Sequence, residues 1–475
     1  MFIFISLLLL IAELPINGQG KEFSTEEISY MNGHKYYGRS EQPYFRVKHK
    51  KHWPIELIHM NDSDFGKHRI PDDDVWMAHD WTEEELKYMH CLDLLCLCPY
   101  YNGSVLDDVC VLPNGDELKP MRRKEYRTLS DDERTQLEKA FRAMHDSGIY
   151  NRLGRVHKYG GVHSGPGFFP WHREFLKRFE FILRRFLPMG SNLGLPYWDS
   201  VMDAYLPNET HSIIFSKYLT GDHNENHEMV YGPYARMKTM EGNPLVKRYL
   251  GHNKQGELIT EARIDVIMDQ QDVVGVLSHS NPLMPCSLLP RFKLDERFFE
   301  YTHDYVHYFI GGDFEETHTS TNDIIFYFHH TFVDFIWEMW RQKIQTKAGR
   351  ESEYPPNDPY CYPPNHFYNA SMDELPNRRI RDGLSNNYTD NLYTYEMRPR
   401  CTHTKPNCGS NFLFCDTENF DRPKCQSKIK FGGNCTGYEK FAICYDGICL
   451  NGYCREEPSF WERLWLWIKR LLRIE

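Results

Sequence analysis

Two stretches of this chain place histidines where they could bind a metal ion. The first, "HSGPGFFPWHREFLKRFE" (163–180), sets His163 and His172 nine positions apart across a glycine-proline turn. The second, "DERFFEYTHDYVHYFIGG" (295–312), sets His303 and His307 four positions apart, so that both project from one helix face and can reach one metal. One pair is weak evidence, because 23 histidines in 475 residues make some close pairs by chance. The inference depends on whether further histidines converge on these.

Six histidines fall on the inner face of an expected helix or in the turn beside it. They form two sets of three, one in each half of the chain: His157, His163 and His172, then His303, His307 and His330. Neutral imidazoles without cysteine or carboxylate suit copper or zinc better than calcium, magnesium or an iron-carboxylate pair. Two three-histidine sites that face each other leave room for O2 to bind between two copper ions.

Four helices must position these histidines. The first follows a capping box formed by Ser130 and Glu133, breaks at Gly148 and resumes toward His157. The second is expected from about Trp171 to Phe186, with His172 on its first turn. The third carries His303 and His307 and ends at 311–312, and the fourth, "NDIIFYFHHTFVDFIWEMWRQ", is apolar nearly all round and belongs in the core. We therefore predict a mainly α fold, a four-helix bundle that holds the metal centre in its middle, with long loops over 200–295 and 345–395.

Around this core the chain divides into further parts. We expect a signal peptide (1–18), an N-terminal cysteine-stapled wrap (19–127), the core (128–397), a cysteine-rich module (398–455) and an amphipathic tail (456–475). The wrap contains "CLDLLCLCPYYNGSVLDDVC", whose four cysteines allow three disulfide pairings; zinc binding is the alternative, but the paired C-x2-C spacing is absent. Eight cysteines between Cys401 and Cys454 predict a disulfide-rich unit separate from the bundle.

Several features predict secretion to the extracellular space or a secretory granule. The chain has an even number of cysteines, 14, and six Asn-x-Ser/Thr sites, at Asn61, Asn102, Asn208, Asn369, Asn387 and Asn434. The formal charge of −11 gives no basic surplus for nucleic acid, which we do not expect as a partner. The tail is too short to span a membrane, and we interpret it as a solvated end or subunit contact, with membrane contact as the alternative.

The chain resembles the tyrosinases, which share a type-3 dicopper fold with catechol oxidases and molluscan hemocyanins. The matching pieces, in order, are "GIYNRLGRVH", "HSGPGFFPWHREFLKRFE", "LPYWDS", "THDYVHYFIGGDF" and "STNDIIFYFHHTFVDFIWEMWR". The overall plan is similar to that of secreted worm tyrosinases, in particular flatworm enzymes that tan the eggshell. The resemblance implies two copper ions as cofactors.

Carried over by motif, the resemblance implies ligands for each copper. Copper A would be held by His157, His163 and His172, and copper B by His303, His307 and His330. His145 is the competing first ligand. In the "HH" pair the ligand of the family is the second, so that His329 supports the site from behind. Trp198, Asp199 and Asp334 would be structural supports or would orient ligands from behind, and Tyr393 and Tyr395 resemble the tyrosine motif that closes the core of the family.

The chain departs from the family at several positions. Gly161 stands where several relatives have the cysteine of a Cys-His thioether, and Ile324 replaces a proline. Asp304 replaces the usual asparagine after the first copper B ligand, and we predict that it accepts the phenol proton, with Glu296 and Glu300 close upstream. Thr317 aligns with the position that limits access over copper A, and its small side chain predicts an open site.

The predicted function is a secreted copper-dependent tyrosinase. It would use O2 to hydroxylate monophenols such as tyrosine, including protein-bound phenols, and to oxidise o-diphenols such as dopa to o-quinones, for quinone tanning of eggshell or cuticle or for melanin formation. The alternatives are a catechol oxidase, a hemocyanin-like O2 binder and an inactive matrix protein. The cysteine-rich module is the candidate for a shield that keeps the enzyme latent.

Overall fold

The computed structural model describes residues 81–277, 286 and 298–457. The predicted signal peptide, Asn61, Glu296 and nearly all of the predicted tail lie outside the described residues.

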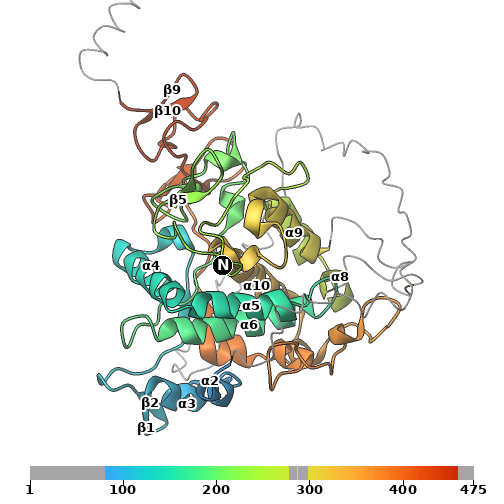
Figure 1. Ribbon diagram of the computed structural model, residues 1–475. Helices are drawn as coiled ribbons and strands as arrows, with labels where there is room; N and C mark the ends of the chain where they lie inside the picture. Colours follow the sequence, from blue (N-terminus) through green and yellow to red (C-terminus); the bar gives the residue numbers. More distant parts are fainter. Residues whose placement is uncertain (1–80, 278–285, 287–297, 458–475) are drawn as a thin grey trace, which may run out of the picture.

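Four helices that carry histidines lie at the centre of the molecule (Figure 1). They are α5 (Ile149–Gly160), α6 (Phe168–Arg184), α9 (Phe299–Ile310) and α10 (Ile325–Ile344). A further helix, α4 (Asp131–Asp146), packs on α5, and its predicted capping box is present between Ser130 and Glu133. Gly148 separates α4 from α5. Its φ of 79° is a left-handed backbone conformation that favours glycine over residues with a side chain. The predicted mainly α fold is confirmed.

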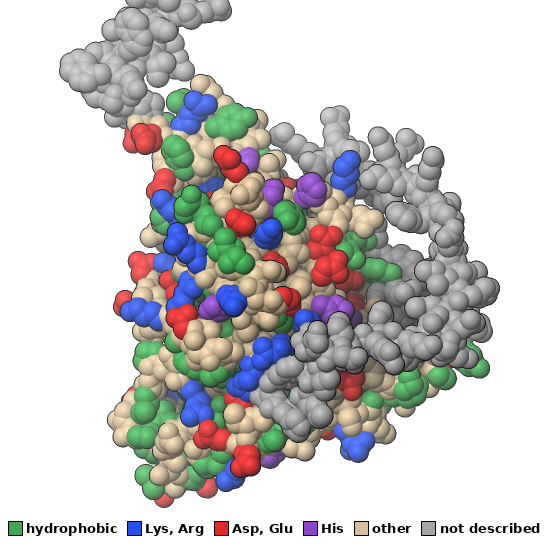
Figure 2. All heavy atoms as spheres, in the orientation of Figure 1, with side chains coloured by type: hydrophobic (Ala, Val, Ile, Leu, Met, Phe, Trp, Pro, Cys, Tyr) green, Lys and Arg blue, Asp and Glu red, His purple; other side chains and the backbone are tan. Residues whose placement is uncertain are grey.

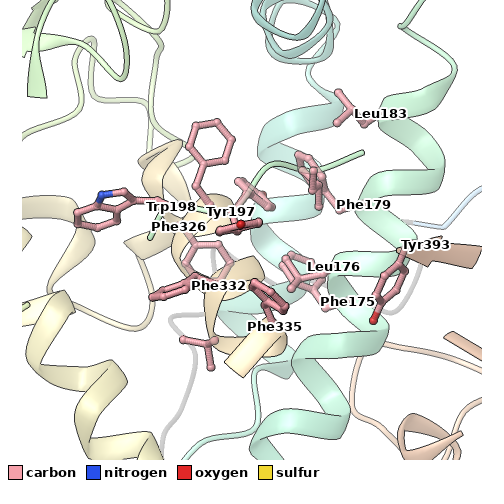
Figure 3. Close-up of a cluster of buried hydrophobic side chains, with 14 of the residues drawn as sticks. Phe175, Leu176, Phe179, Leu183, Tyr197, Trp198, Phe326, Phe332, Phe335 and Tyr393 are labelled. Atoms are coloured by element: carbon pink, nitrogen blue, oxygen red, sulfur yellow. The ribbon is translucent and has the colours of Figure 1, made fainter. Parts of the chain in front are cut away.

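Helices α6 and α10 pack through aromatic side chains (Figure 3). The rings of Phe179 and Tyr327 are stacked with centroids 3.8 Å apart, and Phe175 stacks on Tyr327 at 6.2 Å. Helix α6 begins three residues before the predicted Trp171, because the turn at 165–167 already starts the helical hydrogen bonds. His172 therefore lies on the second turn of α6, and the predicted position on the first turn was wrong.

The strands of the described residues form only two-stranded pairs. Most are local antiparallel hairpins: β1 (Ser104–Leu106) with β2 (Val109–Val111), β4 (Asp222–His223) with β5 (Met229–Tyr231), β7 (Leu413–Asp416) with β8 (Lys424–Ser427), and β9 (Ile448–Leu450) with β10 (Tyr453–Arg455). The exception is β3 (Met121–Arg123), which pairs in parallel with the distant β6 (Tyr393–Tyr395). Tyr393 and Tyr395 thus close the core, and β3, which we assigned to the N-terminal wrap, is part of that closure.

The predicted loop regions contain short helices. These are α7 (Glu261–Met268) and α8 (Val273–Leu277) in the first region and α11 (Lys347–Ser352) in the second; the N-terminal part adds α2 (Glu83–Tyr88) and α3 (Leu94–Leu97). Helix α7 packs on α10 and so belongs to the wall of the core. None of the described helices is long and apolar enough to cross a membrane.

All 14 cysteines form disulfides. The pairs are Cys91–Cys96, Cys98–Cys110, Cys286–Cys361, Cys401–Cys415, Cys408–Cys425, Cys435–Cys449 and Cys444–Cys454. The N-terminal cluster is therefore a disulfide framework, and the zinc alternative is excluded there. The eight cysteines after position 400 pair only among themselves, as predicted.

The cysteine-rich module is nevertheless not separate from the helical core. It occupies one end of the molecule, beside β5 (Figure 1), and lies against residues 202–215. Ile213 N–H donates to Lys428 O over 2.8 Å, and Leu206 shares a buried cluster with Phe414 and Ile429. The expectation of a separate unit was wrong, because the module does have apolar side chains and buries them against the core.

The surface carries both signs of charge. On the face in Figure 2, lysine and arginine side chains are interspersed with aspartate and glutamate. This distribution fits the small negative net charge of the chain.

Candidate metal centre

The three histidines of the second set converge through their Nε2 atoms. His303 and His307, one turn apart on α9, have Nε2 atoms 2.8 Å apart, and His330 Nε2 of α10 lies 3.0 Å from that of His303 and 3.3 Å from that of His307. Three nitrogens bound to one metal at about 2.0 Å each stand roughly 3.3 Å from one another. The spacing of this triad therefore approaches that of a metal-ligand set.

The three histidines of the first set also come together. His157 on α5, His163 in the α5–α6 loop and His172 on α6 have candidate ligand atoms that all lie within 4.8 Å of one another. Both ring nitrogens of His157 and Nε2 of His172 are buried without a hydrogen-bond partner. Buried polar atoms are rarely left unpaired, so these nitrogens are available to a metal ion.

The two triads face each other across α6 and α10. The imidazoles of His172 and His330 are stacked with centroids 4.7 Å apart. Phe326 lies 4.7 Å from His157 and 4.1 Å from His330, and Phe168 lies 4.4 Å from His172 and 4.8 Å from His303. Each of these two phenylalanines is fully buried and contacts both triads.

Hydrogen bonds donated by Nδ1 set the orientation of three of the rings. His172 Nδ1 donates to Phe168 O over 2.8 Å, His307 Nδ1 donates to Phe314 O over 2.7 Å, and His303 Nδ1 donates to the Asp304 carboxylate over 3.1 Å. Acceptors at Nδ1 fix the proton there, which leaves Nε2 unprotonated as the coordinating atom. The protein thus selects one tautomer for these ligand candidates.

Burial keeps all six rings neutral. It lowers the pKa of His163 and of His307 to about 4, and it lowers the pKa of the other four well below the ordinary value for histidine. Neutral imidazole is the form that binds copper. All six residues therefore fit a pair of copper ions in charge state, three of them also fit in tautomer, and the second triad fits in spacing.

Two other histidines, His145 and His329, are not among the candidate ligands of either triad. His145, at the end of α4, bonds through Nε2 to Lys238 O at 3.0 Å and is not part of either triad. His329 is fully buried behind the second triad, stacked on His303 at 5.0 Å with an interplanar angle of 11°, and neither of its ring nitrogens has a partner. It therefore lies against His303 and outside both groups of candidate ligands.

Asp304 and Glu300 flank the second triad on α9. Asp304 is partly exposed, at 31 % of its side chain, and burial raises its pKa to about 6. Glu300 is buried and accepts the backbone N–H groups of Ser164 and Gly165, the two residues after His163. Burial raises the pKa of Glu300, and the negative charge of Asp304 raises it further.

The loop that carries His163 is fastened from a second direction. His366 is buried, and its Nδ1 accepts the backbone N–H of Gly167 over 3.1 Å. A Cβ at Gly165 would lie 2.5 Å from that same nitrogen, so only glycine fits there. His366 could not be predicted from the sequence, because a lone histidine in "PPNHFY" has no characteristic spacing from other histidines. The glycines of "HSGPG" were the one indication of a close approach.

Two predicted supports of the ligands differ in role. The Asp334 carboxylate binds Arg173, Arg123, Tyr393 and Tyr395 rather than a histidine. Of the two roles predicted for Asp334, these contacts agree with the structural one, because they fix α10 to α6 and β6. Asp199 forms an ion pair with Arg398 and does not contact the triads. Trp198 lies 6.3 Å from His329, centroid to centroid, and is the one member of "PYWDS" that we can place beside the site.

Comparison with known proteins agrees with this geometry. Residues 139–343 match the model of the common central domain of tyrosinase. A tyrosinase-like protein of Caenorhabditis elegans is 42% identical over 383 residues, which cover 80% of this chain and 53% of that protein. Tyrosinase-like protein 1 of Margaritifera margaritifera is 29% identical over 305 residues, 62% of this chain and 57% of that protein. This chain thus spans just over half the length of these two curated relatives.

Among solved structures, a polyphenol oxidase variant from Thermothelomyces thermophila is similar with a TM-score of 0.44 and 19% identity, covering 60% of this chain and 90% of that one. The domain match encloses all six clustered histidines, and the fold of that domain binds two copper ions. Over residues 139–343, the chain therefore contains the common central domain of tyrosinase.

Proposed function

We propose that this chain is a copper-dependent oxidase of phenols, with one copper ion held by His157, His163 and His172 and the other by His303, His307 and His330. The observation that carries the proposal is the pair of neutral histidine triads that face each other, with the rings of His172 and His330 stacked at 4.7 Å. Other features of the fold are consistent with this proposal but would not by themselves lead to it.

Two copper ions bound there would supply the redox chemistry with O2. Hydroxylation of a monophenol and its oxidation consume one O2 and give one o-quinone and one water; oxidation of two o-diphenols consumes one O2 and gives two o-quinones and two waters. The residues of the chain contribute binding, orientation and proton handling. The neutral rings bring no positive charge of their own, and the buried Phe168 and Phe326 contact both triads.

We propose that Asp304 accepts the phenol proton. Its carboxylate lies on the same helix as His303 and His307 and is reachable from solvent. Glu300, by contrast, has its carboxylate engaged by two backbone N–H groups, which favours a role in holding the His163 loop. This assignment makes the protein a tyrosinase that acts on tyrosine and on dopa, including protein-bound phenols. Thr317 is exposed in the loop before α10, and its small side chain is compatible with access of bulky substrates to the site.

The test is oxygen uptake by copper-loaded protein with tyrosine and with dopa, in wild type and two Asp304 variants. Asp304→Asn keeps an acceptor for His303 Nδ1 but cannot take a proton, so tyrosine hydroxylation should fall at least about tenfold while dopa oxidation and copper content stay near wild type. Asp304→Leu should lose both the proton acceptor and the orientation of His303. A wild type that oxidises only dopa would make the protein a catechol oxidase, and reversible O2 binding without turnover would make it an O2 binder.

We further propose that the protein is secreted and that its quinones cross-link an extracellular matrix such as eggshell or cuticle, or form melanin. Seven disulfides support an oxidising compartment. Of the five sequon asparagines within the described residues, Asn102, Asn369 and Asn387 are exposed and so accessible to glycosylation. Mass spectrometry of protein from the medium of secreting cells, before and after deglycosylation, tests both points.

A further inference from the structure

The cysteine-rich module reaches toward the metal centre through a chain of buried polar groups. We propose that Ser427 of this module and Ser212 are positioning residues for the second triad, and that they act through Asp203 and Trp198. The proposal rests on the proposed function, since it takes the second triad as a copper site. It assigns the module a part in building that site.

Asp203 is the centre of the chain of contacts. It is fully buried, and its two carboxylate oxygens accept hydrogen bonds from three side chains: the Arg127 guanidinium at 2.9 and 3.0 Å, the Trp198 indole N–H at 2.8 Å and the Ser212 hydroxyl. Arg127 also pairs with Glu125, so the guanidinium is shared by two carboxylates. Because the single positive charge of Arg127 is shared between Glu125 and Asp203, the buried negative charge of Asp203 also depends on the neutral donors Trp198 and Ser212 for its stabilisation.

Trp198 links Asp203 to the histidines. Its backbone N–H donates to Phe328 O over 3.0 Å, at the turn of α10 that carries His329 and His330. Its indole centroid lies 6.3 Å from that of His329, and His329 is stacked on His303 at 5.0 Å. Figure 3 shows Trp198 at the edge of the aromatic cluster around α10. A shift of this indole therefore reaches the second triad through one ring, His329, while the described contacts of the first triad do not include it.

Ser427 completes the chain from the module. The Ser212 and Ser427 hydroxyl oxygens lie 2.9 Å apart and both residues are fully buried. Because a carboxylate only accepts, the Ser212 proton is directed at Asp203, so the proton of the shared bond belongs to Ser427. The direction of donation is thus Ser427 to Ser212 to Asp203. Ser427 ends strand β8, which the disulfides Cys408–Cys425 and Cys401–Cys415 hold in place through the β7–β8 hairpin.

The experiment measures copper release from the full chain with each copper isolated. In a His157→Ala background only the second triad should hold copper, and in a His330→Ala background only the first. Ser427→Ala should speed release to a chelator about three- to tenfold in the first background and leave it unchanged in the second. Ser427→Thr, which restores the hydroxyl, should restore the wild-type rate, and Thr404→Ala, at an exposed threonine of the same module, should have no effect. Ser212→Ala, which removes the middle hydroxyl, should likewise speed copper release in the His157→Ala background and leave it unchanged in the His330→Ala background.

Other results would overturn the proposal. Equal acceleration in both backgrounds, or failure of Ser427→Thr to restore the rate, would mean that the hydroxyl contributes only to general stability. No change in either background, with copper bound in both, would remove the positioning role and leave the proposed function intact. A wild-type protein that binds no copper would overturn both.

Discussion

Glu300 and Gly165 are joined across the metal centre: the carboxylate of Glu300, on α9, accepts the backbone N–H of Gly165 over 3.1 Å and also that of Ser164. Glu300 lies three residues before His303, and Gly165 lies two residues after His163. One side chain therefore ties the helix of the second triad to the loop of the first.

Removing this tie should weaken the first copper site. In Glu300→Ala, the buried N–H of Gly165 and the partly buried N–H of Ser164 lose their acceptor, at a cost of about 1–3 kcal/mol for the buried group. We expect the affinity of the first triad for copper to fall by at least about tenfold, measured by chelator competition in a His330→Ala background. Glu300→Gln keeps one acceptor oxygen, so its copper affinity at the first triad should lie between those of wild type and Glu300→Ala. Unchanged affinity in Glu300→Ala would show that packing alone holds the loop.

His157 and His145 should behave differently. His157 faces its triad with two unpaired ring nitrogens, whereas His145 is bonded to Lys238 O outside it. His157→Ala should lower the copper content from two per chain to one, and His145→Ala should leave it near two. Metal analysis of the purified proteins decides the point, and the reverse pattern would transfer the ligand role to His145.

Gly161 should not tolerate a side chain. A Cβ there would lie 2.8 Å from His163 Cε1 and 2.7 Å from His157 O, both closer than ordinary contacts. Gly161→Ala should displace the His163 ring and reduce copper binding at the first triad, with a loss of stability of about 1–3 kcal/mol. Thermal unfolding with and without copper measures the two effects separately. Wild-type copper affinity in this variant would mean that the loop adjusts without moving the ring.

Asp265 should destabilise the fold at neutral and higher pH. Burial, together with the negative charges of Glu261 on α7 and of Asp269 directly after that helix, raises its pKa from the ordinary value to about 7. The unfolded chain ionises this group near pH 4, so the folded state loses stability as pH rises from there to about 7. At pH 8, Asp265→Asn should raise the melting temperature by roughly a few degrees. At pH 4, where the group is protonated in both states, the melting temperature should hardly change. Glu439→Gln, at an exposed site, is the control and should change neither value.

The sequence predicted most of what forms the metal centre. Helical spacing placed His303 and His307 on one face, and the capping box at Ser130 and the break at Gly148 lie where they were expected. Local rules suffice for such features, because residues three or four apart on a helix always share a face.

What the sequence did not predict depends on contacts between distant residues. Glu300 meets Gly165 over a separation of 135 residues, and His366 meets Gly167 over 199. Asp334 lies one helical turn from His330, which left a structural role and a role in orienting a ligand both open. Arg173 and Tyr393 bind its oxygens because they face it from α6 and β6. Composition also misjudged the cysteine-rich module, whose few apolar side chains are enough to bury one face against residues 202–215.

The parallel pairing of β3 with β6 has a consequence for biosynthesis. Arg123 of β3 inserts its guanidinium 3.4 Å from the centre of the Tyr393 ring and bonds to the Tyr395 hydroxyl, 272 residues further along. A ribosome must therefore finish nearly the whole domain before Arg123 gains these partners, and closing so long a loop is slow compared with local helix packing. The helices that bear the histidines can assemble during translation, whereas the strand that locks them is synthesised after all of them.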